Sequence, residues 1–136
     1  MKEGQGNFFV YFKTDVHLAR HNFGKDRFKV AMTVETPLLI WREYKELASI
    51  ECAGQGYPTG GLSVPNIEID TDKKNGSCLI RAGDVLFKKI NVGAPACAVV
   101  YNESNGLLVS YYTMTTVTNG GDYKILIPKG ELFYFE

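Results

Sequence analysis

The sequence has few of the residues that most often carry out chemistry. Its 136 residues include two histidines, His17 and His21, one tryptophan and three cysteines. The HExxH pattern of zinc proteases, the GxSxG turn of serine hydrolases and the GK[ST] ending of a phosphate-binding loop are all absent. These absences favour a non-enzymatic protein with no catalytic residues, no cofactor and no bound metal.

The two histidines are the arrangement that comes nearest to a metal site. His17 and His21 are four residues apart, so a helix would place both imidazoles on one side, which is the geometry of two zinc ligands. The three residues between them, Leu-Ala-Arg, supply no further ligand. We therefore expect two solvated histidines on the polar face of a helix.

The chain also lacks an excess of either charge and any long apolar run. Fifteen basic residues balance fifteen acidic ones, which disfavours binding to nucleic acid through a basic surface. No run approaches the ~20 apolar residues of a membrane helix. The polar start, MKEGQGN, is not followed by the apolar core of a signal peptide. We expect a protein that is made in a cytosol and binds neither nucleic acid nor membrane.

The three cysteines are Cys52, Cys78 and Cys97. They are odd in number, lie far apart and show no CxxC spacing. This pattern favours reduced, buried thiols over a disulfide bond.

Aromatic residues, by contrast, are abundant. Eight Phe and eight Tyr belong to a composition that is 45% hydrophobic, and aromatic side chains fit the half-buried surface of a β-sheet. The length suits one domain. We expect residues 1–136 to form a single domain with an N-terminal helix over residues 7–23 and a β region over residues 27–136.

Two helices are predicted in the first third of the chain. Apolar residues recur every three or four positions over residues 7–23, which predicts one amphipathic helix. They are Phe8, Phe12, Val16, Ala19 and Phe23. Gly24 follows and supplies the left-handed residue that ends a helix. A short second helix is predicted over residues 39–48, where Trp41 and Tyr44 share a face.

The remaining sequence indicates short strands separated by turns. Residues 28–34 alternate between apolar and less apolar side chains, which is typical of a half-buried strand. Residues 96–101 are apolar throughout and indicate a central strand covered on both faces. Further strands are predicted over residues 107–114, 123–127 and 132–135. Asn-Gly pairs at 75–76, 105–106 and 119–120 favour type I′ hairpins.

This series of elements predicts a mainly β fold. We expect a β-sandwich or flattened barrel of about seven to nine strands, with the N-terminal helix and one short helix packed against it. Carboxylates at Glu68, Asp70 and Asp72 follow the period of one strand face. An acid–base pair could be drawn from them, but we interpret them as an ordinary solvated face.

The segment Gly54–Gly61, GQGYPTGG, is the most unusual part of the sequence. Four glycines in eight residues cost conformational entropy on folding, so such a segment is usually kept for its backbone shape. We interpret it as a tight loop that leads into a strand, with the ring of Tyr57 lying on the sheet, rather than as a ligand-binding loop.

A set of short motifs runs through the chain in order. They are Phe28-Lys-Val-Ala-Met32, Tyr44, Glu51-Cys-Ala-Gly-Gln-Gly-Tyr-Pro-Thr-Gly-Gly61, Asp84-Val-Leu-Phe87, Ala98-Val-Val-Tyr-Asn102, Leu107-Leu108 and the closing segment from Gly121 to Phe133. In this order the chain resembles the small structural proteins of tailed bacteriophages. The likeness spans nearly the full length. It departs over residues 7–23, which are aromatic-rich where that family often has Ala and Leu.

The resemblance implies a virion protein with no catalytic residues to carry over. We expect a capsid decoration, or cement, protein that binds the lattice of the major capsid protein, or other virion proteins, as a homo-oligomer on the particle. It would be made in the cytoplasm of the bacterial host. A tail, neck or fibre-adaptor protein is the first alternative. A carbohydrate-binding module, suggested by the many Tyr and Phe, is the second.

Three segments are candidate contacts with such partners. They are the N-terminal segment with Phe9 and Tyr11, the loop with Gln55 and Tyr57, and the chain end with Phe133 and Phe135. Phe9 and Tyr11 fall outside the predicted helix stripe, so they are left over for a second surface. The alternative is that all these side chains complete the core, since a small domain needs most of its apolar residues.

Overall fold

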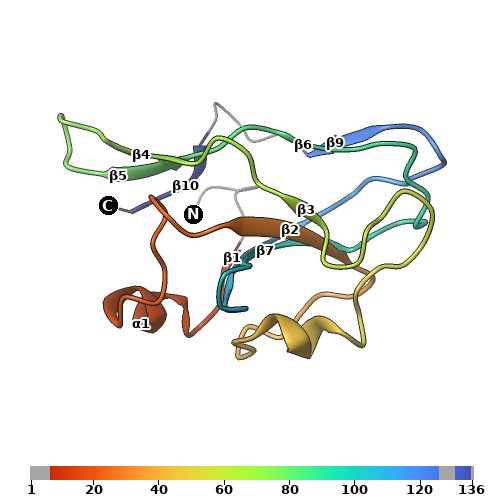
Figure 1. Cartoon of the computed structure of the whole chain (residues 1–136), viewed down its shortest axis with the longest axis horizontal. Helices are drawn as coiled ribbons and strands as arrows, with labels where there is room; N and C mark the ends of the chain where they lie inside the picture. The colour runs from red at the N-terminus through yellow and green to blue at the C-terminus, as the bar shows by residue number, and fades with distance from the viewer. Residues whose placement is uncertain (1–6, 126–130, 136) are drawn as a thin grey trace.

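The computed structural model of the protein describes residues 7–125 and the backbone of residues 131–135, and it is mainly β, as predicted. Its strands are β1 (Asn7–Phe8), β2 (Phe28–Thr33), β3 (Leu62–Ser63), β4 (Glu68–Thr71), β5 (Cys78–Arg81), β6 (Val85–Phe87), β7 (Cys97–Asn102), β8 (Leu108–Thr113), β9 (Tyr123–Ile125) and β10 (Glu131–Phe135). They stack in two layers, which confirms the predicted sandwich (Figure 1).

The larger layer is a sheet with the strand order β1-β8-β7-β2-β3. The facing layer combines the sheet β10-β5-β4 with the pair β6-β9 (Figure 1). Every strand pair in these sheets is antiparallel. There are two short helical segments in the described residues. The 3₁₀ helix η1 (Tyr44–Leu47) lies on the other side of the larger sheet, whereas α1 (Phe12–His17) contributes Phe12 to the core between the layers.

The centre of the larger sheet is β7, as its continuous apolar sequence predicts. Val99 and Val100 point to opposite faces and both are fully buried. The neighbouring strand β2 was expected to be half-buried, and this is wrong: Ala31 and Thr33 are buried as completely as Val30. The reason is that the sheet is covered on both faces.

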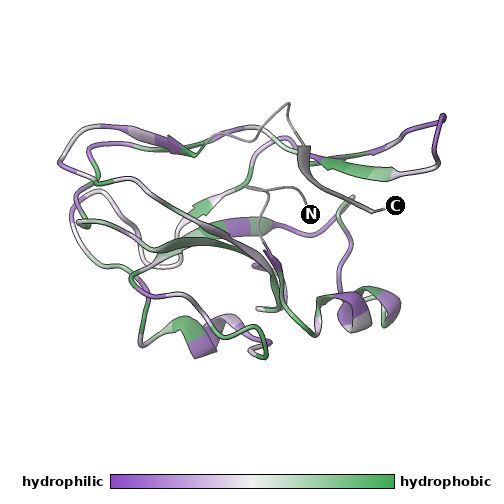
Figure 2. Ribbon diagram, turned by 180° about the vertical axis from the view of Figure 1, so that it is seen from behind, coloured by the Kyte–Doolittle hydropathy of each residue, from purple (hydrophilic) through white to green (hydrophobic). Residues whose placement is uncertain are grey.

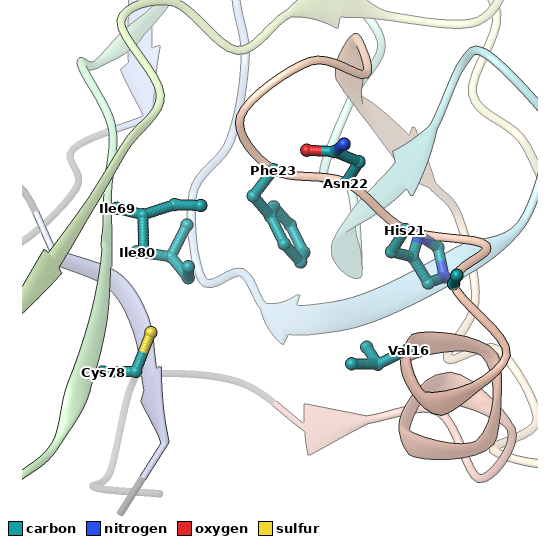
Figure 3. Close-up of a pocket in the computed structure, with 8 residues that line it drawn as sticks. Val16, His21, Asn22, Phe23, Ile69, Cys78 and Ile80 are labelled. Atoms are coloured by element: carbon teal, nitrogen blue, oxygen red, sulfur yellow. The ribbon is translucent and has the colours of Figure 1, made fainter.

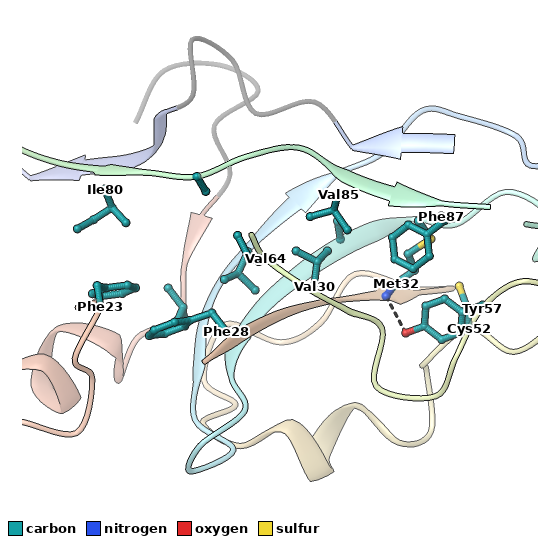
Figure 4. Packing of buried hydrophobic residues seen from close by; sticks show 14 of the residues in the cluster. Phe23, Phe28, Val30, Met32, Cys52, Tyr57, Val64, Ile80, Val85 and Phe87 are labelled. Atoms are coloured by element: carbon teal, nitrogen blue, oxygen red, sulfur yellow. Dashed lines mark hydrogen bonds between the residues drawn. The ribbon is translucent and has the colours of Figure 1, made fainter. Parts of the chain in front are cut away.

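Each face of this sheet has its own hydrophobic core. Between the two layers, Val30 and Met32 pack with Val85 and Phe87 of β6 (Figure 4). On the opposite face, Ala31, Val99 and Leu108 pack against residues of the segment that contains η1, among them Leu47. The domain therefore has three tiers, with the larger sheet in the middle.

The predicted helix over residues 7–23 is wrong. Residues 7 and 8 form β1, which pairs with β8, and α1 has only six residues and ends at His17. The left-handed residue that follows it is Ala19, with φ 59°, and not Gly24. Aromatic residues are weak helix formers. Here Phe8, Phe12 and Phe23 reach one core from a strand, a helix and a loop.

The predicted helix over residues 39–48 is also shorter than expected. Only Tyr44–Leu47 is helical, and it is a 3₁₀ turn. Its start is fixed by a capping box. The side chain of Glu43 accepts the backbone N–H of Glu46, and the side chain of Glu46 accepts the backbone N–H of Glu43. The backbone before it pairs with the β7–β8 loop, where Leu108 donates to the carbonyl of Arg42 over 2.8 Å.

The expected type I′ turns are wrong at all three Asn-Gly pairs, because none of the asparagines has the positive φ that both central residues of such a turn need. Asp72–Ser77 and Asn102–Leu107 close four-residue loops in which only the glycine has a positive φ, 75° at Gly76 and 78° at Gly106. The asparagine before each glycine accepts, through its side chain, the N–H two residues on. Loops of this length are commonly built around a type I turn.

The three cysteines are free thiols in different surroundings. Cys52 and Cys97 are buried, and burial raises the pKa of both thiols, that of Cys52 to about 11. Cys78 is only half-buried. Because the thiolate is the reactive form, we expect one thiol, Cys78, to react with a disulfide reagent in the native protein and three after denaturation without reductant. Fewer than three reactive thiols in the denatured chain would reveal a disulfide bond.

Candidate interaction surface

The structure divides the six predicted contact residues into three groups. Phe9 is 2% exposed and packs its ring edge against Tyr111, and Tyr57 is also buried, so both are core residues. Tyr11 and Gln55 are exposed. The side chains of Phe133 and Phe135 lie outside the described residues, although β10 itself pairs with β5. Of the predicted contact residues whose side chains are described, Tyr11 and Gln55 are the ones on the surface.

Two chain segments bring exposed apolar side chains together beside Tyr11. The amide of Val10 donates to the carbonyl of Leu39 over 2.9 Å, so the residues before α1 lie against the residues after Pro37. Val10 is 59% exposed and Ile40 is 68% exposed. We call the set Val10, Tyr11, Leu38, Leu39 and Ile40 the apolar surface.

Sequence reasoning found only part of this surface. The helix predicted over residues 39–48 includes residues 39 and 40. It therefore divides Leu38-Leu39-Ile40, a run of three large apolar residues just after Pro37. Such a run outside a strand or helix cannot bury all its side chains on one face. That signal was available in the sequence.

A buried carboxylate, that of Asp15, binds Arg42, and Arg42 lies against Tyr11 of the apolar surface. Asp15 of α1 is fully buried, and it accepts hydrogen bonds from Arg42 and, over 3.2 Å, from Arg20. Burial alone would raise the pKa of Asp15, but the hydrogen bond and charge of Arg42 outweigh it and keep the pKa below its usual value. The guanidinium of Arg42 also lies 4.9 Å from the centre of the Tyr11 ring.

The glycine-rich loop is fixed by a second carboxylate. Glu51 accepts hydrogen bonds from the hydroxyls of Tyr44 and Tyr57, the latter over 2.5 Å, and from the amide of Gly60 over 2.7 Å. The Tyr57 hydroxyl in turn accepts the amide of Met32 in β2 (Figure 4). The ring therefore lies on the sheet, as interpreted from the sequence.

The tyrosines around Glu51 serve as hydrogen-bond donors. Burial, and next the bond to Glu51, raises the pKa of both Tyr44 and Tyr57, so their hydroxyls keep their protons. Tyr101 donates to the carbonyl of Gly60 over 2.6 Å, and burial raises its pKa to about 12. With its acceptor oxygens taken up by these donors, the carboxylate has a structural role.

The two histidines lie in different surroundings, contrary to expectation. His17 is exposed at the end of α1, where its Nδ1 lies 2.7 Å from the carbonyl of Lys13. His21 is in the loop after α1 and is buried. Over residues 7–125, no group of three His, Cys, Asp or Glu side chains is placed to hold a metal ion.

Two of the three predicted solvated carboxylates, Glu68 and Asp70, are on β4, which forms a hairpin with β5. Asp72 follows the strand, is half-buried and accepts the amide of Lys74 over 2.9 Å, so the prediction is wrong for this residue. Every residue of β4 is exposed, and Asp70 pairs with Arg81 over 3.4 Å. Figure 2 shows the tip of this hairpin as strongly hydrophilic. Glu68 and Asp70 thus behave as the solvated face that the spacing predicts.

Comparison with protein-family models, curated proteins and solved structures finds no match to this chain. Among the described residues, neither helix is long or apolar enough to cross a membrane. The functional assignment therefore depends on the surface and the core of the molecule itself.

Proposed function

We propose that this protein is a non-enzymatic structural protein of a tailed-bacteriophage virion, and that it decorates the capsid by binding the lattice of the major capsid protein. The observation that carries this proposal is the apolar surface at Val10, Tyr11 and Leu38–Ile40. The resemblance of the ordered motifs to those of small phage structural proteins suggests the kind of partner.

The apolar surface suits adhesion to a preformed shell. Removing apolar area from water contributes about 25 cal/mol per Å². The ring of Tyr11 is placed beforehand by Arg42, and the backbone hydrogen bond between Val10 and Leu39 fixes the two segments relative to each other, so less backbone freedom remains to be lost on binding. A homo-oligomer would engage several lattice subunits at once and add avidity to modest single contacts.

The balanced charge of the chain also suits crowding on a shell. Fifteen basic and fifteen acidic residues cancel, whereas copies of one strong sign placed side by side would repel each other. A tail, neck or fibre-adaptor position in the same kind of particle would use the same surface. Detection of the protein in tailless heads, at a copy number near that of the capsid protein, distinguishes decoration from these positions.

A carbohydrate-binding module receives less support. Such a module would present exposed aromatic rings in a row. Over residues 7–125, Tyr11 is the single exposed aromatic side chain, and its ring lies beside Arg42. The abundance of Phe and Tyr in the sequence is accounted for mainly by the two cores.

The apolar surface is tested by the double variant Val10→Ser, Ile40→Ser. Both side chains are exposed, so the variant should unfold cooperatively at nearly the parent temperature. Its binding to undecorated heads, measured by co-sedimentation, should weaken about 100-fold, since each lost contact removes about 1.4 kcal/mol.

Val117→Ser is the matched control. Val117 is 72% exposed and lies outside the apolar surface, so this variant should bind like the parent protein. A folded double variant with unchanged affinity would exclude the apolar surface as the adhesive. Equal weakening by the control would show that the contact depends on general surface hydrophobicity.

A further inference from the structure

His21 lies where three parts of the chain meet. It belongs to the loop between α1 and β2, faces Asn102 at the start of the β7–β8 hairpin loop, and is 8% exposed. Its ring is 5.3 Å from that of Phe12 and about 6 Å from those of Phe23 and Phe28, measured between ring centres. A histidine in such a position has few ways to accommodate a charge.

The protonation state of His21 follows from the orientation of Asn102. The side-chain oxygen of Asn102 accepts the amide of Ser104 over 2.9 Å, and its nitrogen donates to Asp26 over 2.9 Å. The same amide nitrogen lies 3.3 Å from Nδ1 of His21. The same nitrogen also lies 3.4 Å from the carbonyl of Arg20, so its two hydrogens are shared among three acceptors. An amide nitrogen only donates, so a proton on Nδ1 would face a donor, and this arrangement favours the neutral ring with its single proton on Nε2.

The second ring nitrogen has no partner. Nε2 of His21 is buried and makes no hydrogen bond within the described part of the chain. A protonated ring would carry a donor on each nitrogen. Its Nδ1 proton would then point at the amino group of Asn102, and its Nε2 proton would still find no acceptor.

The charged groups around His21 already have ion-pair or hydrogen-bond partners. Asp15 of α1 is held by Arg20 and Arg42, and Asp26 accepts both Asn102 and the backbone amide of Asn22. On the hairpin loop, Glu103 pairs with Lys29 over 2.9 Å. Asp15 and Asp26 attract a proton to the ring, but burial is the larger effect and lowers the pKa of His21 below 6.5.

Hydrogen bonds to the residues that follow Asn102 also hold the loop of residues 18–27 to the β7–β8 hairpin. Asn105 donates to the carbonyl of Arg20 over 2.5 Å, and the amide of Arg27 donates to Ser104 over 3.2 Å. This loop borders an open cavity of about 370 Å³, which is lined by His21 itself, by Val16 and Phe23 and, across the gap, by Ile80 (Figure 3). The cavity gives a displaced ring access to water.

We propose that His21 is a pH-sensitive latch: protonation breaks its contact with Asn102 and releases residues 18–27 from the β7–β8 hairpin, while the sheets stay folded. This inference does not depend on the proposed function. The released loop carries Phe23 away from Phe12 and Phe28, so acidification exposes aromatic surface at this end of the domain.

The direction of the pH effect follows from linkage. The folded protein binds a proton at His21 more weakly than the unfolded chain does, because burial lowers the folded-state pKa. The stabilising contribution is therefore complete above the unfolded-state pKa of about 6.5. It decreases as the pH falls below that value toward the folded-state pKa.

Amide hydrogen exchange from pH 7.5 to pH 5 tests the latch above the range where most carboxylates titrate. Protection factors, corrected for the intrinsic rate at each pH, should fall about tenfold or more for residues 18–27 and stay constant for β7. His17→Gln removes the exposed histidine and should leave this behaviour unchanged. His21→Phe, or His21→Gln if the first does not fold, should make the protection of residues 18–27 independent of pH.

Two results would overturn the proposal. One is constant protection of residues 18–27 in the unmodified protein across this pH range. The other is the same acid-induced loss in a folded His21 variant, which would assign the pH dependence to another group. Simultaneous loss of protection in β7 would also contradict it, because the whole domain would then be unfolding.

Discussion

Gly61→Ala is expected to destabilise the folded protein severely. Gly61 has φ 79°, and a Cβ at this position would lie 1.8 Å from the carbonyl oxygen of Val30 and 2.6 Å from its carbonyl carbon. These atoms belong to β2, where Val30 pairs with Leu62 of β3. Because backbone in a paired strand cannot move aside cheaply, the expected loss exceeds about 4 kcal/mol, in the range of the most damaging substitutions.

Gly76→Ala is the matched control for this substitution. Gly76 has nearly the same φ, 75°, but a Cβ there meets nothing within 4 Å. Its cost should be the left-handed backbone penalty alone, about 1–2 kcal/mol. Urea unfolding of both variants measures the difference. Equal losses would mean that the glycine-rich loop does not lie against β2 in solution.

Glu51→Ala is the second substitution with a large expected effect. It removes the acceptor for two tyrosine hydroxyls and for the amide of Gly60. A buried donor left without a partner costs about 1–3 kcal/mol. Because water can reach the half-buried Tyr44, we expect a total loss of about 3 kcal/mol in the free energy of unfolding, seen as a lower denaturation midpoint.

Two variants distinguish the stability lost with the hydrogen bonds of Glu51 from the stability lost on removing any carboxylate. Tyr57→Phe removes one donor to Glu51 and one acceptor for the amide of Met32, and should cost about 1–2 kcal/mol. Glu68→Ala removes a fully solvated carboxylate of β4 and should change stability by less than about 0.5 kcal/mol. If Glu51→Ala is as mild as Glu68→Ala, the tyrosines are not held by this carboxylate.

The elements predicted well from sequence are those whose pattern does not depend on distant partners. The continuous apolar run at residues 96–101 marks a strand covered on both faces whatever the fold around it. The helix over residues 7–23 failed for the opposite reason. The spacing of Phe8, Phe12 and Phe23 is helical, but the pairing of Phe8 with Ser110 and the burial of His21 against Asn102 come from the β7–β8 hairpin. No local window contains that information.

Only part of the candidate surface was predicted, because burial near the N-terminus also depends on strands that come much later in the chain. Tyr11 was recognised because it falls outside the apolar stripe, but Phe9, which also falls outside it, is buried against Tyr111 by β8. The convergence of Tyr44 and Tyr57 on Glu51 was equally hidden. All three residues are part of the motif set seen in the sequence, yet their shared contact exists only after the loop has closed.

The order of strands in the larger sheet has a consequence for synthesis on the ribosome. β2 pairs with β7 along its full length, from Phe28 opposite Asn102 to Thr33 opposite Cys97. About 70 residues must therefore be translated before the central ladder can form, which takes on the order of several seconds at about 5–20 residues per second. During that time Val30 and Met32 lack the core that they share with Val85 and Phe87, so their apolar side chains stay in contact with water.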